Sequence, residues 1–152
     1  MGLDMYLEKE IYIWEDARKD IHIKGLPNKE EYKFDINELS KLVFKAAYWR
    51  KANQIHHWFV ENVQDGEDDC KRYYVDKEQL IELRKMCEKI LNEKDKDKQL
   101  KLAKKLLPPS EGFFFGTYEY DEWYFQDLKD TVKQLKNVEV DSFNDYYYQA
   151  SW

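Results

Sequence analysis

Polar side chains that could bind a ligand recur along one stripe of a predicted long helix between Asp35 and Asp65. The first half of this stripe carries apolar residues such as Leu39 and Leu42, as expected for a face that packs on a core. At about 100° per residue, the same helical face then continues with four polar residues. These are Arg50, Asn53, His57 and Gln64. Buried polar groups need partners, so this half of the stripe either holds a polar ligand or forms an internal network.

The residue types of the stripe suit a small anionic ligand that carries a ring. Arginine presents a fixed fork of donors to phosphate or carboxylate. Asparagine and glutamine can hydrogen-bond to the polar edge of a ligand ring, and histidine can donate or accept a hydrogen bond or change its protonation. We therefore expect Arg50 and Lys51 to contact phosphate and an aromatic side chain to stack on the ring. The predicted ligand-binding residues are Trp49, Arg50, Lys51, Asn53, His57, Gln64, Phe115, Thr117 and Tyr118.

The alternative interpretation is a sealed polar network that ties the helix to a sheet. In that case Arg50 pairs with a carboxylate such as Asp4, and the stripe residues contact only one another and the sheet. Solvent access to the four polar residues distinguishes the two interpretations.

A second candidate segment is the run Gly112–Gly116, in which three phenylalanines lie between two glycines. The amides of Gly116 and Thr117, together with the threonine hydroxyl, could hold a phosphate beside aromatic faces. The more common use of such a run is to anchor a loop in the core, because phenylalanine is mostly buried.

Metal and catalytic motifs are scarce in this chain. The side chains of His56 and His57 would point about 100° apart on a helix, which does not suit one shared ion. Cys70 and Cys87 lack metal-site spacing, and there is no GxSxG, GxGxxG or Walker loop. We expect no metal and no cofactor. Catalysis with His57 as a base is unsupported, and the question of enzymatic activity stays open.

The elements that position these residues follow from periodicity and punctuation. Residues 3–7, 11–14 and 21–23 alternate or are β-branched, which predicts strands of an antiparallel meander. Capping-box patterns begin the long helix at Asp35 and a second helix at Asp76, while Asp121 begins a later one. A third helix lies near residues 98–107, and residues 138–148 return to strand character. We expect an α+β fold, a small antiparallel sheet from both chain ends packed against one long helix and two to three further helices.

Length and composition place the chain among ordered single-domain proteins, over residues 1–152. The net charge of −6 opposes sequence-independent binding to phosphate backbones, so we expect no direct nucleic-acid binding. Two unpaired thiols and the lack of a long apolar run predict a cytoplasmic protein without a membrane segment.

Several motifs together resemble a group of small accessory proteins carried by bacteriophages and prophages. The matching motifs are the start MGLDMYL, YWRKANQIHHWF from Tyr48, NVQDG from Asn62 and GFFFG from Gly112. The resemblance spans most of the chain, and it implies a role rather than an activity. Small acidic phage proteins often antagonise bacterial immunity, in the cytoplasm of the infected host.

The leading functional hypothesis from the sequence is a counter-defence protein that sequesters a small anionic, nucleotide-like ligand. The first alternative is a protein–protein inhibitor of a bacterial immune effector, which uses the acidic residues 67–69 and exposed tyrosine and tryptophan. The second is a small nucleotide hydrolase. The partner is thus a small anionic ligand or a host immune protein, and self-association is left open.

Overall fold

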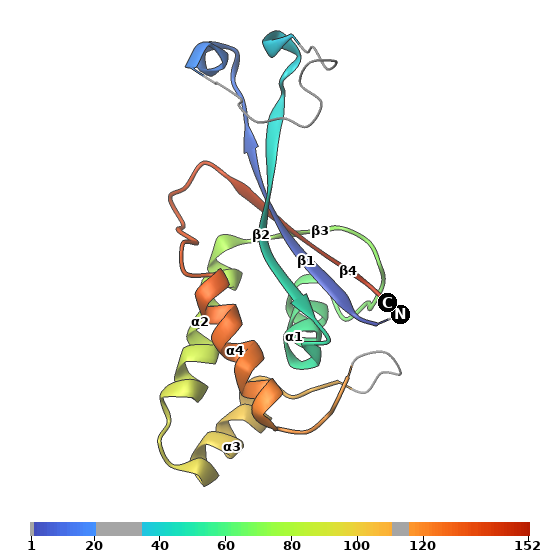
Figure 1. Ribbon diagram of the computed structural model, residues 1–152, viewed down its shortest axis with the longest axis vertical. Helices are drawn as coiled ribbons and strands as arrows, with labels where there is room; N and C mark the ends of the chain where they lie inside the picture. The colour runs from blue at the N-terminus through green and yellow to red at the C-terminus, as the bar shows by residue number, and fades with distance from the viewer. Residues whose placement is uncertain (1, 21–34, 111–115) are drawn as a thin grey trace.

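The chain folds as an α+β protein in which a four-stranded antiparallel sheet packs on α-helices (Figure 1). The computed structural model describes residues 2–20, 35–110 and 116–152. In chain order the elements are β1 (Asp4–Tyr12), the 3-10 helices η1 (Glu15–Asp20) and η2 (Ile36–Glu38), β2 (Lys41–Arg50), α1 (Asn53–Val63), β3 (Tyr73–Val75), α2 (Lys77–Asn92), α3 (Lys96–Leu106), α4 (Glu122–Gln134) and β4 (Asp145–Ser151).

The two chain ends supply the central strands of the sheet, as predicted. The strand order is β2-β1-β4-β3, and every neighbouring pair is antiparallel. The prediction of separate strands over residues 3–7 and 11–14 is wrong, because β1 is one continuous strand through Tyr12. The strand expected at residues 21–23 lies outside the described residues.

The long helix expected between Asp35 and Asp65 is wrong over its first half. Asp35 does cap a helical turn, with its side chain accepting from the amide of Asn37, but that turn is only η2. Leu39 is already extended, and the chain then pairs with β1 as the strand β2. Cross-strand pairing outweighs a helix propensity that is weak in any case. The polar stripe is therefore divided between a strand and the short helix α1.

The remaining helix signals are confirmed. Asp76 and Gln79 form the expected capping box at the start of α2, and the side chain of Asp121 caps α4. The helix α1 ends where predicted: Asp65 and Gly66 both have positive φ, at 54° and 79°. Glycine adopts this left-handed conformation readily, which stops the helix.

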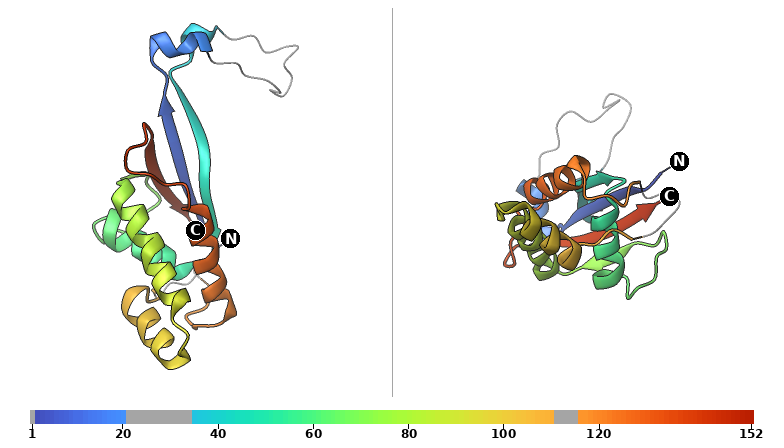
Figure 2. Two further views of the ribbon diagram at one scale, coloured as in Figure 1. Left: turned by 90° about the vertical axis from the view of Figure 1, so that its left-hand side faces the viewer. Right: turned by 90° about the horizontal axis from the view of Figure 1, so that it is seen from below.

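The core lies on one face of the sheet. The helices pack on this face (Figure 2). Alternate strand residues such as Met5 and Tyr148 are fully buried there. The ring of Phe59 on α1 stacks on that of Tyr148, with centroids 3.8 Å apart and planes 7° apart. The opposite face of the sheet carries charged and tyrosine side chains that helices do not cover.

The β1–β2 pair extends well beyond the rest of the sheet (Figure 1). A bulge interrupts the pairing after Leu7, and β4 accompanies β1 only as far as Glu10, which lies opposite Asp145. We call the part of this pair beyond the bulge, residues 8–20 and 35–45, the arm. Its outer half has no third strand beside it in the described structure.

Candidate functional site

Two of the predicted ligand-binding side chains are buried and hydrogen-bonded within the protein. Asn53 is 1% exposed, and its amide makes two bonds to the backbone of Ser110: Nδ2 donates to the carbonyl at 2.7 Å, and the Ser110 amide donates to Oδ1 at 2.8 Å. Gln64 is 2% exposed and donates to the carbonyl of Glu67 at 2.7 Å. Both side-chain amides are therefore satisfied by backbone groups of the protein itself.

Trp49 also belongs to the core. Its ring is 4% exposed and packs on Phe59, with centroids 5.8 Å apart. The indole N–H donates to the hydroxyl of Thr131 at 2.9 Å, and that hydroxyl donates to the carbonyl of Asp127. The ring has no face left for stacking on a ligand.

Arg50 takes the carboxylate partner that the network interpretation named, but at the surface. It lies directly opposite Asp4 in the sheet register, with 3.9 Å between Nε and the carboxylate oxygen Oδ1. Its side chain is 65% exposed. The phenol of Tyr48 donates to the same carboxylate. An exposed pair of this length contributes little to stability.

Four of the predicted residues come from two segments that meet at one place. Lys51 has a positive φ of 58°, and Gly116 packs against it so closely that a Cβ there would lie 3.2 Å from the Lys51 carbonyl oxygen. Arg50 adjoins one side of this contact, and Thr117 and Tyr118 adjoin the other, all exposed. Phe115, the remaining stacking candidate, lies outside the described residues.

The start of α1 is not arranged as an anion site. Its cap residue, Ala52, has no side chain that could cap the helix. The amide of Asn53 donates to the Lys51 carbonyl, and those of Ile55 and His56 both donate to the Ala52 carbonyl. Three of the first four helical amides are thus already engaged, which removes most of the donors that attract phosphate to a helix start.

His57 faces a separate cavity of about 190 Å³ between α1 and the end of α3. Trp58 and Leu107 help to line it. The indole N–H of Trp58 is buried and has no acceptor among the described residues. The four polar stripe residues therefore do not share one pocket.

A buried polar chain lies next to this region and involves the neighbouring histidine. His56 is 1% exposed, with Tyr148 Oη 2.7 Å from Nδ1 and Asp68 Oδ1 2.9 Å from Nε2. Burial lowers the pKa of His56, and the Asp68 carboxylate opposes this shift. The phenol of Tyr148 has its pKa raised well above the usual value, chiefly by burial. The arrangement links α1 to β4 and to the loop after α1.

The acidic run that the inhibitor hypothesis used is partly engaged within the protein. Asp68 bonds His56, and Asp69 pairs with Lys71 at 2.8 Å. A hydrogen bond from Lys71 lowers the pKa of Asp69. Glu67 is exposed, and its carboxylate has no hydrogen bond or ion pair within the described part of the chain. A partner surface built on this run would have to compete with these internal contacts.

Several large apolar side chains on the arm are exposed. Trp14 is 76% exposed, Tyr12 51%, Val43 49% and Phe44 43%. Phe143, in the connection before β4, is 97% exposed and shares a groove of about 470 Å³ with Tyr12 and Trp14. Large apolar side chains gathered in this way mark interaction sites on soluble proteins.

A charged cluster on the uncovered face braces the base of the arm. Glu10 is 2% exposed and accepts from Lys41 at 2.9 Å and from Arg72 at 2.6 Å. The bond from Lys41 lowers the pKa of Glu10, burial opposes this, and Arg72 adds to the lowering. The guanidinium of Arg72 lies over the ring of Tyr147, 3.8 Å from its centroid. These bonds connect both strands of the arm to the body, so the arm leaves it at a defined angle.

Neither a metal site nor a membrane-spanning helix is found among the described residues. No group of three His, Cys, Asp or Glu side chains within residues 2–20, 35–110 and 116–152 is placed to hold a metal ion. None of the described helices combines the length and apolarity needed to cross a membrane. Comparisons of the chain with protein-family models, curated proteins and solved structures found no match.

The arm was missed in the sequence because its residues fit a helical period as well as a strand. The signal that could have found it is the composition of residues 41–50, which includes Val43, Phe44, Tyr48 and Trp49. Aromatic and β-branched residues at this density favour a strand. A second signal is the position of Trp14 at the end of the apolar run 11–14, directly before the charged stretch at residues 15–20.

Proposed function

We propose that this chain is a non-catalytic binding protein that docks on another protein through its arm. The observation that carries the proposal is the set of exposed apolar side chains on the arm and on the adjoining connection before β4, above all Trp14 and Phe143, which share one groove. Tryptophan and tyrosine are the residues that most often dominate protein interfaces. The braced base at Glu10 supports the proposal, because a rigid arm loses little entropy on binding.

The class of partner that we propose is a bacterial immune effector. This part rests on the resemblance to phage accessory proteins, and it retains the inhibitor hypothesis with a different surface. The surface moves from the acidic residues 67–69 to the arm, because Asp68 and Asp69 have internal partners.

The test uses a photo-reactive phenylalanine analogue placed at position 14 or 143 in bacteria that express the protein. Trp123 is the matched control position, because it is 75% exposed but lies on α4, away from the arm. Discrete adducts at positions 14 and 143, with none at 123, identify a candidate partner. The partner is then purified and titrated with the wild-type protein.

The proposal predicts that Trp14→Ser and Phe143→Ser each weaken this binding at least about tenfold, as for interface hot spots. Trp123→Ser should leave it unchanged. Equal affinity in all four proteins, or no adduct specific to positions 14 and 143, would refute docking through the arm.

A second candidate function is the sequestration of a small anionic ligand by Arg50, Lys51, Thr117 and Tyr118. The close packing of Lys51 on Gly116, which brings the two segments together, favours it. Isothermal titration with cyclic dinucleotides and ADP-ribose derivatives tests it. Binding that is lost in Arg50→Ala and kept in Trp14→Ser supports this function, and no heat with any of these ligands rejects it.

A further inference from the structure

We propose that the free edge of β2 receives an extended segment of the partner protein, which adds to the sheet as a further strand. This inference rests on the proposed docking function and specifies the mode of recognition. Strand addition supplies backbone hydrogen bonds for affinity, while alternate side chains give selectivity. The edge strand β2 meets the requirements for both.

The backbone of β2 points its hydrogen-bonding groups outward at every second residue. In an antiparallel pair, residues alternate between bonding the partner strand and facing away from it. The amide of Ile13 donates to the Ser40 carbonyl at 3.0 Å, so Ser40 faces β1. Counting along the register, Lys41, Val43 and Lys45 direct their N–H and C=O groups away from β1. No hydrogen bond to these outward groups occurs within the described structure.

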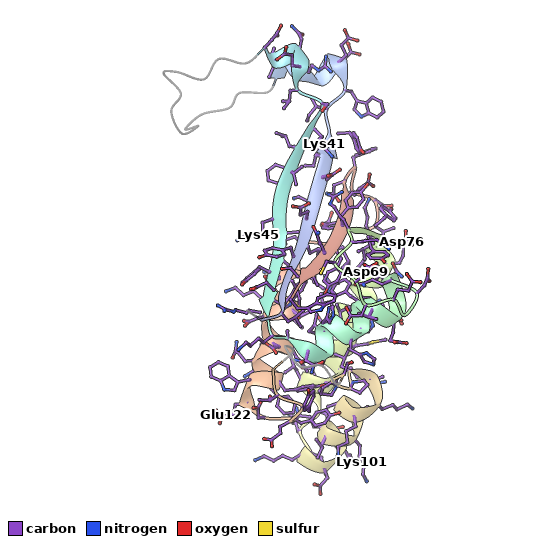
Figure 3. All side chains as sticks on the ribbon, turned by 90° about the vertical axis from the view of Figure 1, so that its right-hand side faces the viewer. Lys41, Lys45, Asp69, Asp76, Lys101 and Glu122 are labelled. Carbon is purple, nitrogen blue, oxygen red and sulfur yellow. The ribbon has the colours of Figure 1, made fainter. Side chains whose placement is uncertain are left out.

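The same edge is closed nearer to the body, which confirms the phase of the alternation. Beyond the bulge, the outward amide of Tyr48 donates to the side chain of Gln134 on α4 at 2.8 Å. The helix thus satisfies the edge at this point and leaves it open from Lys41 to Lys45. Figure 3 shows Lys41 and Lys45 along this stretch of the arm, with Lys41 nearer to its tip.

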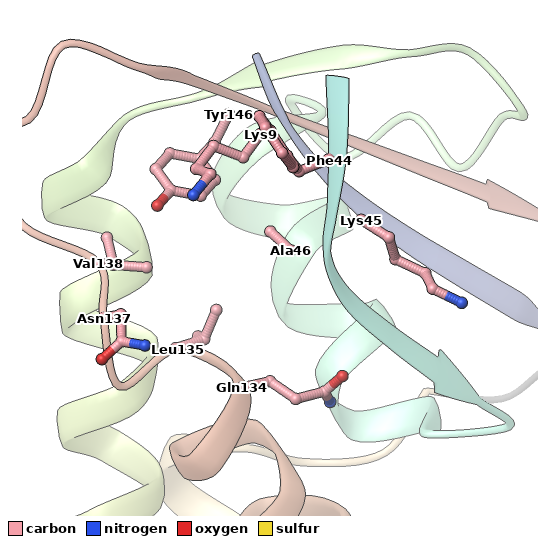
Figure 4. Close-up of a pocket in the computed structure, with 9 residues that line it drawn as sticks. All are labelled: Lys9, Phe44, Lys45, Ala46, Gln134, Leu135, Asn137, Val138 and Tyr146. Atoms are coloured by element: carbon pink, nitrogen blue, oxygen red, sulfur yellow. The ribbon is translucent and has the colours of Figure 1, made fainter. Parts of the chain in front are cut away.

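An added strand would bring every second side chain next to a cavity on the helix side of the sheet. This cavity has a volume of about 280 Å³ and lies where the arm leaves the body (Figure 4). Its walls include Phe44, Ala46, Leu135 and Val138. A partner residue opposite Phe44 would therefore be apolar, since its side chain would leave water for this wall.

Lys45, on the edge strand, has a cationic group without an acidic partner among the described residues. Its ammonium group lies over the ring of Tyr48, 5.6 Å from the ring centroid, whereas that of Lys41 is paired with Glu10. Opposite charges on neighbouring strands stabilise a sheet, so the incoming segment would carry a carboxylate beside Lys45.

A second copy of this chain is a poorer occupant than an acidic segment. Two-fold antiparallel pairing of β2 about Val43 would place Lys41 of one copy opposite Lys45 of the other. Like charges directly opposite each other destabilise a sheet. The expected occupant is an extended segment with apolar residues between carboxylates.

The test uses a synthetic capped peptide of sequence TEVFVET, with TKVFVKT as its charge-reversed control. Binding is measured on the full-length protein by amide chemical shifts. We expect TEVFVET to perturb the amides of residues 41–45 and TKVFVKT to bind at least several-fold more weakly. Perturbation elsewhere, or equal binding of the two peptides, would overturn the inference.

The backbone contribution is isolated by Val43→Pro, which removes an outward N–H and leaves the ladder to β1 intact. Val43→Thr keeps the N–H and is its matched control. Loss of a ladder bond should weaken the peptide about tenfold in the proline variant and little in the threonine variant. Unchanged affinity in a folded Val43→Pro protein contradicts strand addition.

A charge-swap variant keeps the test decisive if the proline variant does not fold. Lys45→Glu leaves the backbone unchanged and should remove the preference for TEVFVET over TKVFVKT; an unchanged preference rejects the inference. If adducts at positions 14 and 143 persist while the peptide tests fail, docking holds and strand addition is wrong. If those adducts are absent, docking itself is wrong.

Discussion

The Nδ1 atom of His56 and the hydroxyl of Tyr148 lie 2.7 Å apart in the core, although 92 positions separate them in the chain. The bond joins α1 to the last strand, next to the stack of Phe59 on the same tyrosine ring. We expect Tyr148→Phe to keep the stack and to lower the free energy of unfolding by about 1–2 kcal/mol, because a buried bond is lost. Urea denaturation measures this. Tyr74→Phe, at a tyrosine that is 51% exposed, is the control and should change little.

Acid should destabilise the protein through His56. Burial lowers the pKa of His56 in the folded protein below the usual value of 6.5. As the pH falls through about 6.5, the unfolded chain takes up a proton that the folded protein does not, so folding stability is lost. The stability that wild type holds relative to His56→Gln should therefore shrink between pH 7.5 and pH 5, as measured by urea denaturation at each pH. A difference that does not vary with pH would contradict this prediction.

Asp127 should show the opposite dependence on pH. Burial raises the pKa of its carboxyl to about 6, although a hydrogen bond from Gln54 opposes this. At neutral pH the charged form is disfavoured, so Asp127→Asn should stabilise the protein by about 1 kcal/mol, since water still reaches the half-buried group. As the pH falls from 7 to 4, the folded wild type takes up the proton first and the advantage of the variant should disappear. Thermal denaturation of both proteins across this range checks it.

Asn53 should act as an anchor for the segment that follows α3. Asn53→Ala removes both bonds to the Ser110 backbone, and we expect a loss of about 2 kcal/mol because these groups stay buried. Hydrogen exchange of the Ser110 amide and of residues 116–118 should accelerate. Asn137→Ala, at an exposed asparagine, is the control. Normal exchange in Asn53→Ala would show that other contacts hold the segment.

Two glycines with positive φ should differ in their tolerance of alanine. Gly66 has φ 79° and open space around an added Cβ, so Gly66→Ala should cost about 1 kcal/mol through backbone strain alone. At Gly116, with φ 92°, the added Cβ would also lie 3.2 Å from the Lys51 carbonyl. Gly116→Ala should therefore lower the melting temperature more than Gly66→Ala. Equal shifts in melting temperature would mean that the backbone at Lys51 moves away from the added Cβ without a loss of stability.

The elements that the sequence predicts well have signals within a few residues. The start of α2 follows from the capping box of Asp76 and Gln79, and the end of α1 follows from Gly66, because backbone groups at helix ends must find local partners. The pairing of the two chain ends was also predictable, since short alternating runs there need neighbouring strands.

The secondary structure around the polar stripe could not be predicted from such local signals. Residues 41–50 fit both a helical and a strand period. Pairing with β1 decides between them, because the hydrogen-bond ladder between the two strands is available only to an extended chain. Once β2 forms, Arg50 belongs to a strand, while Asn53 and Gln64 belong to a short helix and its end. These residues therefore do not lie on one face of a single helix.

The sequence by itself determined the fold class, the helix boundaries with caps and the kinds of polar group present, because these depend on local chemistry. Only the tertiary structure decided which of those groups meet solvent. Burial and strand pairing are long-range properties, and they enclosed Trp49, Asn53 and Gln64 while leaving Trp14 and the edge of β2 exposed. The candidate site accordingly moved from a helix stripe to an arm of two strands.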